Sequence, residues 1–415
     1  MKQYLFEDDD ELLALCIIFT QRKMERSIKW MHESVNWSEY VARLRHSGSF
    51  DVKHRMDEQA FDQLVELLRP SITVNTKRSM AGSDGNEPIY PEVICAVGLR
   101  WLAGEMERSL EDVFGISRAS TYRIIDRFIA AVIACDNLSI SLPTSDDELN
   151  ELAEGWNAIS SAAGLFHGVV GAIDGWLCPH SRPLHQNNQL DYFSGHYMRY
   201  GSNVQAVCDS HLRFIYIAFA SPGKTNDLLA FRRCNALREW IDNLHTHHDA
   251  RFYLIGDNAY LLHDSLLIPF SGTSRNDPEK DAYNFFLSEM RIRIEMAFGL
   301  LTTKWRVFRR EIYYELSKTR DMVQAAARLH NFVINRNISI GASIHEEIDP
   351  LNDNSLGLGY HPTVDEGEPS TVNPNAAGSS QRRAWLVQVT EIIFLRMALK
   401  GQVARVVGRV PSGRS

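Results

Sequence analysis

Three acidic residues stand where the sequence predicts that a buried element ends or reaches the surface. Asp174 and Asp257 each close a short apolar run typical of an interior strand, and a glycine lies next to each of them. Glu295 lies on a predicted helix, at the border of its apolar stripe. Carboxylate oxygens are the ligands that Mg²⁺ and Mn²⁺ prefer, and two such ions can activate an attacking oxygen and stabilise a leaving oxygen at a phosphodiester. The sequence therefore predicts a divalent-metal site built from these three carboxylates.

Two of these residues have a simpler interpretation when each is taken alone. Asp257 precedes Asn258 and is placed to cap the next helix or turn. Glu295 is placed on a solvated flank of its helix, paired with Arg291 one turn earlier. For an isolated residue we prefer these interpretations. The metal site depends on the three carboxylates occurring together and in this order.

Composition and charge restrict the class of protein. With 415 residues, of which 44% are hydrophobic and 23% charged, the chain is long enough for two or three domains with a proper core. The net charge of -8 means that any binding to DNA must depend on local basic surface. The six cysteines include no C-x-x-C pair, which argues against a zinc ribbon or a disulfide framework. The acidic N-terminus argues against a secretory signal, and no apolar run approaches the ~18 residues needed to span a membrane.

The elements that must position the carboxylates follow the order strand, hairpin, helix, strand, helix. This order predicts an α/β fold in which helices flank a mixed sheet, with the strand of Asp174 beside the strand of Asp257. In chain order, we expect strands at 168–177, 203–209, 214–220 and 251–255, a helix at 228–241, and a final helix at 287–305.

A helix-turn-helix pattern lies upstream, near 109–128. The first helix ends at a turn around Gly115, and Ser117 is a plausible N-cap of the second. Arg118 and Arg123 on the second helix are candidate DNA contacts. A plain helical hairpin explains the same pattern equally well.

Four regions follow from these patterns. Residues 1–140 form a helical N-terminal region, and 165–335 form the domain that carries the carboxylates. Residues 341–380 are acidic, lack Lys and Arg, and are expected to form a disordered linker. Residues 381–415 form a basic tail whose apolar part we expect to bind the body of the protein or a partner rather than DNA.

A series of motifs resembles the PIF/Harbinger-type DDE transposases and the nucleases derived from them. One of these motifs would be weak, but all of them occur in the family's order. They are Gly171-Ala-Ile-Asp-Gly175, Asn203-Val-Gln-Ala-Val207, Ser221-Pro-Gly-Lys-Thr-Asn-Asp227, Gly256-Asp-Asn-Ala-Tyr260, Arg291-Ile-Arg-Ile-Glu-Met-Ala-Phe-Gly299 and Leu329-His-Asn-Phe332.

The resemblance implies a ribonuclease-H-like fold, a divalent metal cofactor (Mg²⁺ or Mn²⁺, with two ions), and cleavage and joining of DNA ends. It assigns Asp174, Asp257 and Glu295 as catalytic metal ligands. Asp227 matches a further carboxylate of the family, either a metal ligand or a residue that steadies its loop. Arg291 is a candidate DNA contact.

The resemblance also implies partners and a location. Family members commonly act with a separate Myb-like DNA-binding protein, so a protein partner besides DNA and a nuclear location are expected. A homo-oligomer is a separate expectation. The leading hypothesis is a metal-dependent DNA endonuclease or transposase. The alternative is a domesticated, catalytically silent DNA-binding or adaptor protein that keeps the fold, and an RNA-cutting enzyme would differ only in its substrate.

Overall fold

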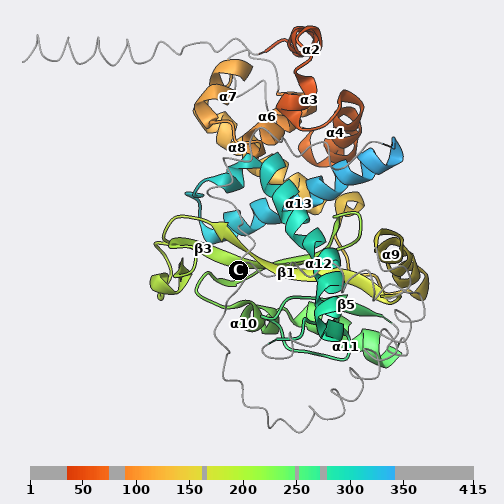
Figure 1. The fold of residues 1–415 in the computed structure, drawn as a ribbon. Coiled ribbons are helices and arrows are strands. Elements are labelled where there is room, and N and C mark those ends of the chain that lie inside the picture. The colour runs from red at the N-terminus through yellow and green to blue at the C-terminus, as the bar shows by residue number, and fades with distance from the viewer. Residues whose placement is uncertain (1–34, 74–88, 161–165, 248–251, 272–277, 342–415) are drawn as a thin grey trace, which may run out of the picture.

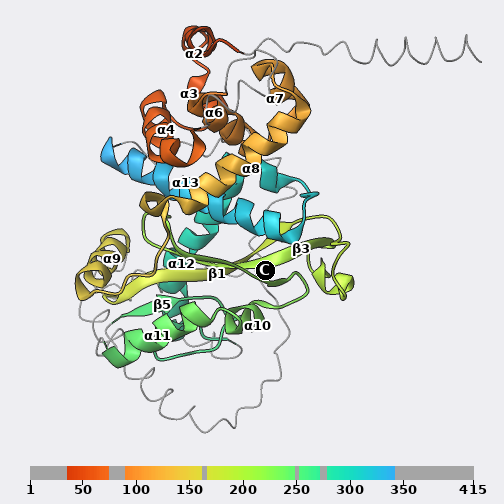
Figure 2. The same ribbon diagram turned by 180° about the vertical axis from the view of Figure 1, so that it is seen from behind.

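The structure is a computed structural model that describes residues 35–73, 89–160, 166–247, 252–271 and 278–341. A group of N-terminal helices lies on one side of a mixed sheet, and shorter helices lie on the other side (Figures 1 and 2). None of the helices in these ranges is long and apolar enough to cross a membrane. The predicted linker and basic tail lie outside the described residues from position 342 onward.

The described parts of the N-terminal region, 35–73 and 89–140, consist mainly of helices. Asn36, Asp57 and Ser117 each precede a helix, and each side chain accepts a hydrogen bond from a backbone N–H of the first turn. Such caps satisfy N–H groups that have no partner within the helix. The helices are α2 (Trp37–His46), α3 (Phe50–His54), α4 (Glu58–Ile72), α6 (Pro91–Leu102), α7 (Glu107–Phe114) and α8 (Arg118–Ala134).

The helices α7 and α8 meet at the predicted turn. Gly115 has φ 59°, in the left-handed region that glycine adopts without a steric penalty, and it ends α7. Arg118 and Arg123 are exposed on α8. Both helices and the turn are therefore present, while the assignment as a DNA-binding helix-turn-helix stays a prediction.

The sheet is mixed, with β1 near its centre. β1 pairs antiparallel with β3 and parallel with β5, so the strand of Asp174 lies beside the strand that leads to Asp257, as predicted. β3 and β4 form the predicted hairpin. The order is β2-β3-β1-β5-β6, and β4 pairs with β3 off this path. The strands are β1 (Val169–Pro179), β2 (Phe193–Ser194), β3 (Arg199–Cys208), β4 (Phe214–Pro222), β5 (Tyr253–Ile255) and β6 (Leu266–Leu267).

Two hydrophobic clusters cover the two faces of the sheet. Ala172 and Trp176 of β1 belong to a large cluster that includes side chains of the N-terminal helices and of the two long C-terminal helices. Val170 and Ile173 belong to a second cluster with the helices on the opposite face. The larger cluster is continuous from the N-terminal helices to the sheet, so these helices and the sheet share one core. The remaining helices are α9 (Asp146–Ile159), α10 (Asp227–Arg232), α11 (Asn235–His247), α12 (Pro278–Lys304) and α13 (Leu316–Ser339).

The predicted single helix at 228–241 is wrong, because the chain forms α10 and α11 there. The N–H groups of Arg233 and Cys234 bind carbonyl groups three residues earlier, which tightens the end of α10. The N–H of Arg238 then bonds to the carbonyl of Cys234 and starts a new helix.

The expectation that the helix through Glu295 is the last one is also wrong, because α13 follows it. Ten of the 24 residues of α13 are buried, and polar residues that are less buried recur at helical spacing, as at Asp321, Gln324 and Arg328, so the sequence does carry a helical period there. α12 also begins earlier than expected, at Pro278.

The motif Leu329-His-Asn-Phe332 has a structural role on α13. The Asn331 side chain accepts a hydrogen bond from the Phe214 N–H and donates one to the Phe214 carbonyl, both at 2.8 Å. His330 Nε2 lies 2.8 Å from the Leu212 carbonyl, to which it donates. The motif therefore bonds the turn of the β3–β4 hairpin and the first residue of β4 to α13.

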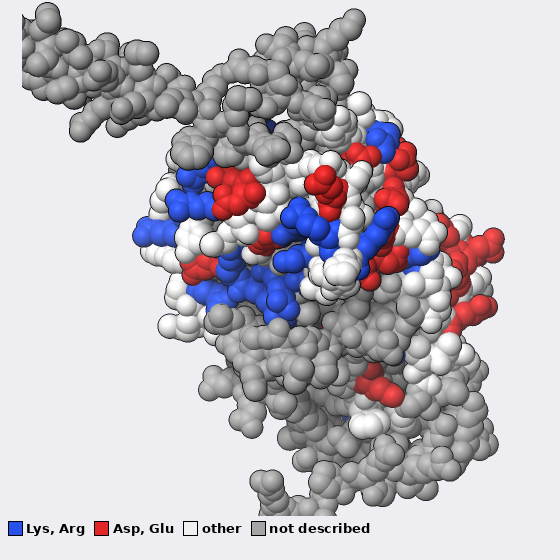
Figure 3. Space-filling model, turned by 90° about the horizontal axis from the view of Figure 1, so that it is seen from above, with Lys and Arg blue, Asp and Glu red and all other residues white. Residues whose placement is uncertain are grey.

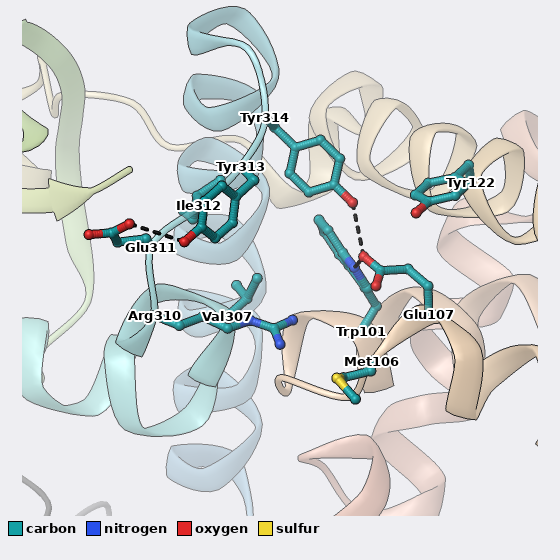
Figure 4. A pocket seen from close by; sticks show the side chains of 10 residues that line it. All are labelled: Trp101, Met106, Glu107, Tyr122, Val307, Arg310, Glu311, Ile312, Tyr313 and Tyr314. Atoms are coloured by element: carbon teal, nitrogen blue, oxygen red, sulfur yellow. Dashed lines mark hydrogen bonds between the residues drawn. The ribbon is translucent and has the colours of Figure 1, made fainter. Parts of the chain in front are cut away.

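A pocket of about 450 Å³ lies between the N-terminal helices and the chain that joins α12 to α13 (Figure 4). Glu107 accepts hydrogen bonds at 3.0 Å from Trp101 Nε1 and from Tyr314 Oη, which lie on opposite sides of this boundary. These bonds outweigh the burial of Glu107 and lower its pKa. The lining residues are Trp101, Met106, Glu107, Tyr122, Val307, Arg310, Glu311, Ile312, Tyr313 and Tyr314.

The substitution Glu107→Ala should destabilise the protein. It removes the acceptor for the Trp101 indole N–H, which is fully buried, and a buried donor without an acceptor costs about 1–3 kcal/mol. Urea denaturation should show this loss. Asp112→Ala, at an exposed position of the same helix, is the control and should remain within about 0.5 kcal/mol of the wild type. Equal losses in the two variants would contradict a structural role for Glu107.

The stability of the protein should fall as the pH is lowered from about 6.5 to about 4, in part because of His330. Burial lowers the pKa of His330 to about 4, whereas an unfolded histidine titrates near ~6.5. Between these values the unfolded chain takes up a proton that the folded chain excludes, so His330 contributes a loss of up to about 1.4 kcal/mol per pH unit.

The test compares urea unfolding at pH 7 and pH 5. His330→Gln should show a smaller difference between the two pH values than the wild type, because Gln keeps a donor for the Leu212 carbonyl but does not titrate. His185→Gln, at an exposed position, should keep the wild-type difference. An unchanged difference in His330→Gln would refute the role of this side chain.

Candidate functional site

The register of two parallel strands brings Asp174 and Asp257 to the same end of the sheet. Ala172 of β1 is opposite Ile255 of β5, and each aspartate lies two residues further along its chain. Side chains two residues apart in an extended chain lie on the same face. Both carboxylates therefore lie on the face of the sheet that carries the side chains of Ala172 and Ile255. This is the face on which α12 packs.

Each aspartate is also held by a backbone N–H close to it in sequence. Asp174 Oδ1 accepts from the Gly175 N–H at 2.7 Å, and Asp257 Oδ1 accepts from the Ala259 N–H at 2.9 Å. The simpler interpretation of Asp257 as a residue that stabilises the following turn is thus correct. It does not exclude a role in the site, since Asp257 also acts electrostatically on Asp174.

The electrostatic environment of Asp174 is unfavourable for a carboxylate. Asp174 is 5% exposed. Its burial raises its pKa well above the ordinary value, the negative charges of Asp257 and Asp227 raise it further, and the charge of Arg291 opposes them. A bound cation would relieve both the burial penalty and the repulsion.

Arg291 links Glu295 to Asp174. Both residues lie on α12, where Arg291 Nη1 is 2.7 Å from Glu295 Oε1 and 3.8 Å from Asp174 Oδ2. The expected pair of Arg291 and Glu295 is therefore present. The Glu295 side chain is only 11% exposed, so the pair lies in the site rather than on a solvated flank.

Asp227 approaches from the other side of β1. It is the first residue of α10, and a Cβ atom added to Gly175 would lie 1.9 Å from Asp227 Oδ1. Asn203 Nδ2 and Gln205 Nε2 donate to the same oxygen, at 2.8 and 3.0 Å. The absence of a side chain at position 175 is therefore what allows the Asp227 carboxylate to lie against β1, where its charge acts on Asp174.

The sequence assigned no role to several residues that lie at the site. Tyr260 Oη donates to Gln205 Oε1 at 2.8 Å, so the chain after β5 is bonded to β3 and through it to Asp227. The N-x-Q spacing of Asn203 and Gln205 was a usable indication, because residues two apart on a strand share a face. Partial burial and then the negative charges of Asp227 and Asp174 raise the pKa of Tyr197 to about 12.

The side chains at the site have the type of ligand atom that a hard divalent cation prefers. All four acidic side chains offer oxygen ligands, and the repulsion at Asp174 favours a positive charge. As the side chains stand, no group of three or more His, Cys, Asp and Glu in the described part of the chain is arranged to hold a metal ion. One reason is visible: the Arg291 guanidinium contacts Glu295 and faces Asp174, where a cation would have to bind.

Comparison with known proteins finds a match for the segment that contains the site. Residues 173–331 match the family model of the DDE superfamily endonucleases. The matched segment includes Asp174, Asp227, Asp257 and Glu295. It also includes the α13 motif up to Asn331.

The other comparisons add little. A crystal structure described as a pre-cleavage Mos1 transpososome aligns with 69% of this chain and 98% of its own, at 9% identity and a TM-score of 0.17. A likeness this low carries no argument. No curated protein matches the chain.

The local basic surface that DNA binding would require is present. Figure 3 views the molecule from the side of the N-terminal helices, where Lys and Arg side chains gather in a patch near the middle of the face. Acidic side chains border this patch. Because the net charge is -8, such a patch is where attraction for phosphate would be concentrated.

The substitution Gly175→Ala should destabilise the sheet at the site. The added methyl group would collide with Asp227 Oδ1 and with Gln205 Nε2, so the strand or the carboxylate must shift, at a cost of about 1–3 kcal/mol. Denaturant unfolding measures the loss. Gly195→Ala, where an added Cβ meets no atom within 4 Å, is the matched control. The proposed close approach of Asp227 is wrong if both variants unfold at the same denaturant concentration.

Proposed function

We propose that this protein is a divalent-metal-dependent DNA endonuclease of the transposase type. The observation that carries the proposal is the burial of Asp174 among the carboxylates of Asp257 and Asp227, within the segment that matches the DDE superfamily endonucleases. A site of this kind is unfavourable in itself and becomes favourable with a cation.

Asp174, Asp257 and Glu295 are proposed as the catalytic carboxylates that hold Mg²⁺ or Mn²⁺. Asp227 is proposed as a fourth acidic residue of the site, oriented by Asn203 and Gln205. When bound, the metal supplies Lewis-acid activation of the attacking water or 3′ hydroxyl and stabilises the leaving oxygen.

The chain itself supplies rigid positions for these groups. Asp174 lies on a central strand, Asp257 is held by the turn that follows β5, and Glu295 lies on a long buried helix. Rigid elements hold reacting groups more precisely than loops do. Arg118 and Arg123 are exposed and available for phosphate contacts, and Arg291 is placed at the carboxylates themselves.

The finer assignments belong to the same proposal. They are a ribonuclease-H-like fold, membership of the PIF/Harbinger group, joining of the freed 3′ ends to target DNA, a nuclear location, a Myb-like protein partner and a homo-oligomer. The resemblance of the motifs supports them, and the mixed sheet flanked by helices fits the first of them.

Removing one carboxylate should abolish the activity. Asp257→Ala should reduce the Mn²⁺-dependent cleavage rate to background on DNA that carries transposon terminal repeats, because the site loses a central ligand. The measurement is the rate of strand cleavage on a gel, with and without Mn²⁺. Asp136→Asn, at an exposed position outside the site, is the control and should cleave at the wild-type rate.

Two outcomes would contradict the proposal. Cleavage by Asp257→Ala at the wild-type rate would show that the carboxylate is not required. Failure of the wild-type protein to bind Mg²⁺ or Mn²⁺ in calorimetry would favour the catalytically silent adaptor protein instead.

A further inference from the structure

We propose that Arg291 is a built-in counter-ion of the carboxylate site, which a divalent cation must displace in order to bind. The inference rests on the proposed function, because it concerns the metal affinity of the same site. It assigns to Arg291 a regulatory role that precedes any contact with DNA.

The contacts of Arg291 place its charge between two proposed metal ligands. Nη1 lies 2.7 Å from Glu295 Oε1 and 3.8 Å from Asp174 Oδ2, so one guanidinium faces a carboxylate of the helix and a carboxylate of the sheet. Without this positive charge, Asp174 would face the negative charges of Asp257 and Asp227 with less compensation. Arg291 therefore supplies the positive charge that this group of carboxylates needs in the absence of a cation.

Burial makes this interaction strong. The side chains of Arg291, Glu295 and Asp174 are 21%, 11% and 7% exposed, so water screens their charges only partly. An arginine stays protonated at any pH at which the protein is folded, so deprotonation cannot remove its charge from the site. Only movement of the side chain, or competition by another cation, can do so.

The backbone on both sides of the pair is fixed. Met290 and Ile294 of α12 are buried on the sheet next to Arg291 and Glu295, and Asp174 lies on a central strand. A shift of the helix is therefore not available to separate the two charges. The Glu295 carboxylate has to rotate away from Arg291 when it binds a cation, and the guanidinium has to turn aside.

This competition predicts the direction of a measurable change. A divalent cation bound between Asp174 and Glu295 would repel the guanidinium and would also take over its partner carboxylate. Removing the guanidinium abolishes both opposing effects, so the metal should bind more tightly. If Arg291 were only a structural ion pair, its removal would destabilise the protein and leave the metal affinity unchanged.

The experiment measures Mn²⁺ binding to the full chain by isothermal titration calorimetry. Arg291→Gln should lower the Kd for Mn²⁺ at least about fivefold, the lower end of a typical coupling between two binding events. Arg293→Gln is the matched control, because it removes the same charge from the same helix at a residue that forms no ion pair among the described residues. It should keep the wild-type Kd within about twofold, which is under ~0.5 kcal/mol.

Thermal unfolding gives a second readout. The metal-free Arg291→Gln protein should melt at a lower temperature than the wild type, and Mn²⁺ should raise its melting temperature by more than it raises that of the wild type. Should Arg291→Gln fail to fold, Arg291→Lys keeps a positive charge but lacks the planar fork of arginine, and its affinity for Mn²⁺ should lie above that of the wild type.

The outcomes separate this inference from the proposed function. Mn²⁺ binding by the wild type, with equal or weaker binding by the Arg291 variants, overturns the counter-ion role and leaves the metal site in place. If Arg293→Gln also binds Mn²⁺ more tightly, the change in affinity comes from the overall charge of α12. That result also overturns the counter-ion role of Arg291. Absence of Mn²⁺ binding in every variant overturns the proposed function, and the inference with it.

Discussion

The crowding of negative charge at one end of the sheet is the constraint on which the rest of this structure depends. Asp174 is buried on a central strand, and the carboxylates of Asp257 and Asp227 act on it from the next strand and from the other side of β1. Burial and like charge both oppose ionisation, so the arrangement persists only with compensation. Arg291 supplies part of it in the metal-free protein, and a divalent cation would supply more.

Interactions outside the carboxylates hold this unfavourable group together. The parallel register of β1 and β5 sets the positions of the first two, and a network of amide and phenol hydrogen bonds through Gln205 holds Asp227. The absence of a side chain at Gly175 gives that carboxylate its space. On the opposite end of the hairpin, His330 and Asn331 fasten β4 to α13. These contacts hold the carboxylates in place against their mutual repulsion.

The N-terminal helices are part of the same body. Their side chains join the large hydrophobic cluster that reaches the sheet, and Glu107 bonds across the boundary at the pocket of Figure 4. The exposed Arg118 and Arg123 of α8 are therefore held by the same core as the strands that carry the carboxylates.

The sequence alone determined the types of the site residues, their order, and most of the elements that carry them. Strands β1, β3 and β4 and helices α7, α8 and α12 were predictable because alternation and helical spacing are local patterns. The break between α10 and α11 and the bonds that hold Asp227 were not. They depend on hydrogen bonds at one helix end and on contacts such as that of Tyr260 with Gln205, 55 positions apart. Only the tertiary structure could decide that Arg291 stands between Glu295 and Asp174, because spacing along a helix predicts one partner of a side chain and the packing of that helix on the sheet determines the other.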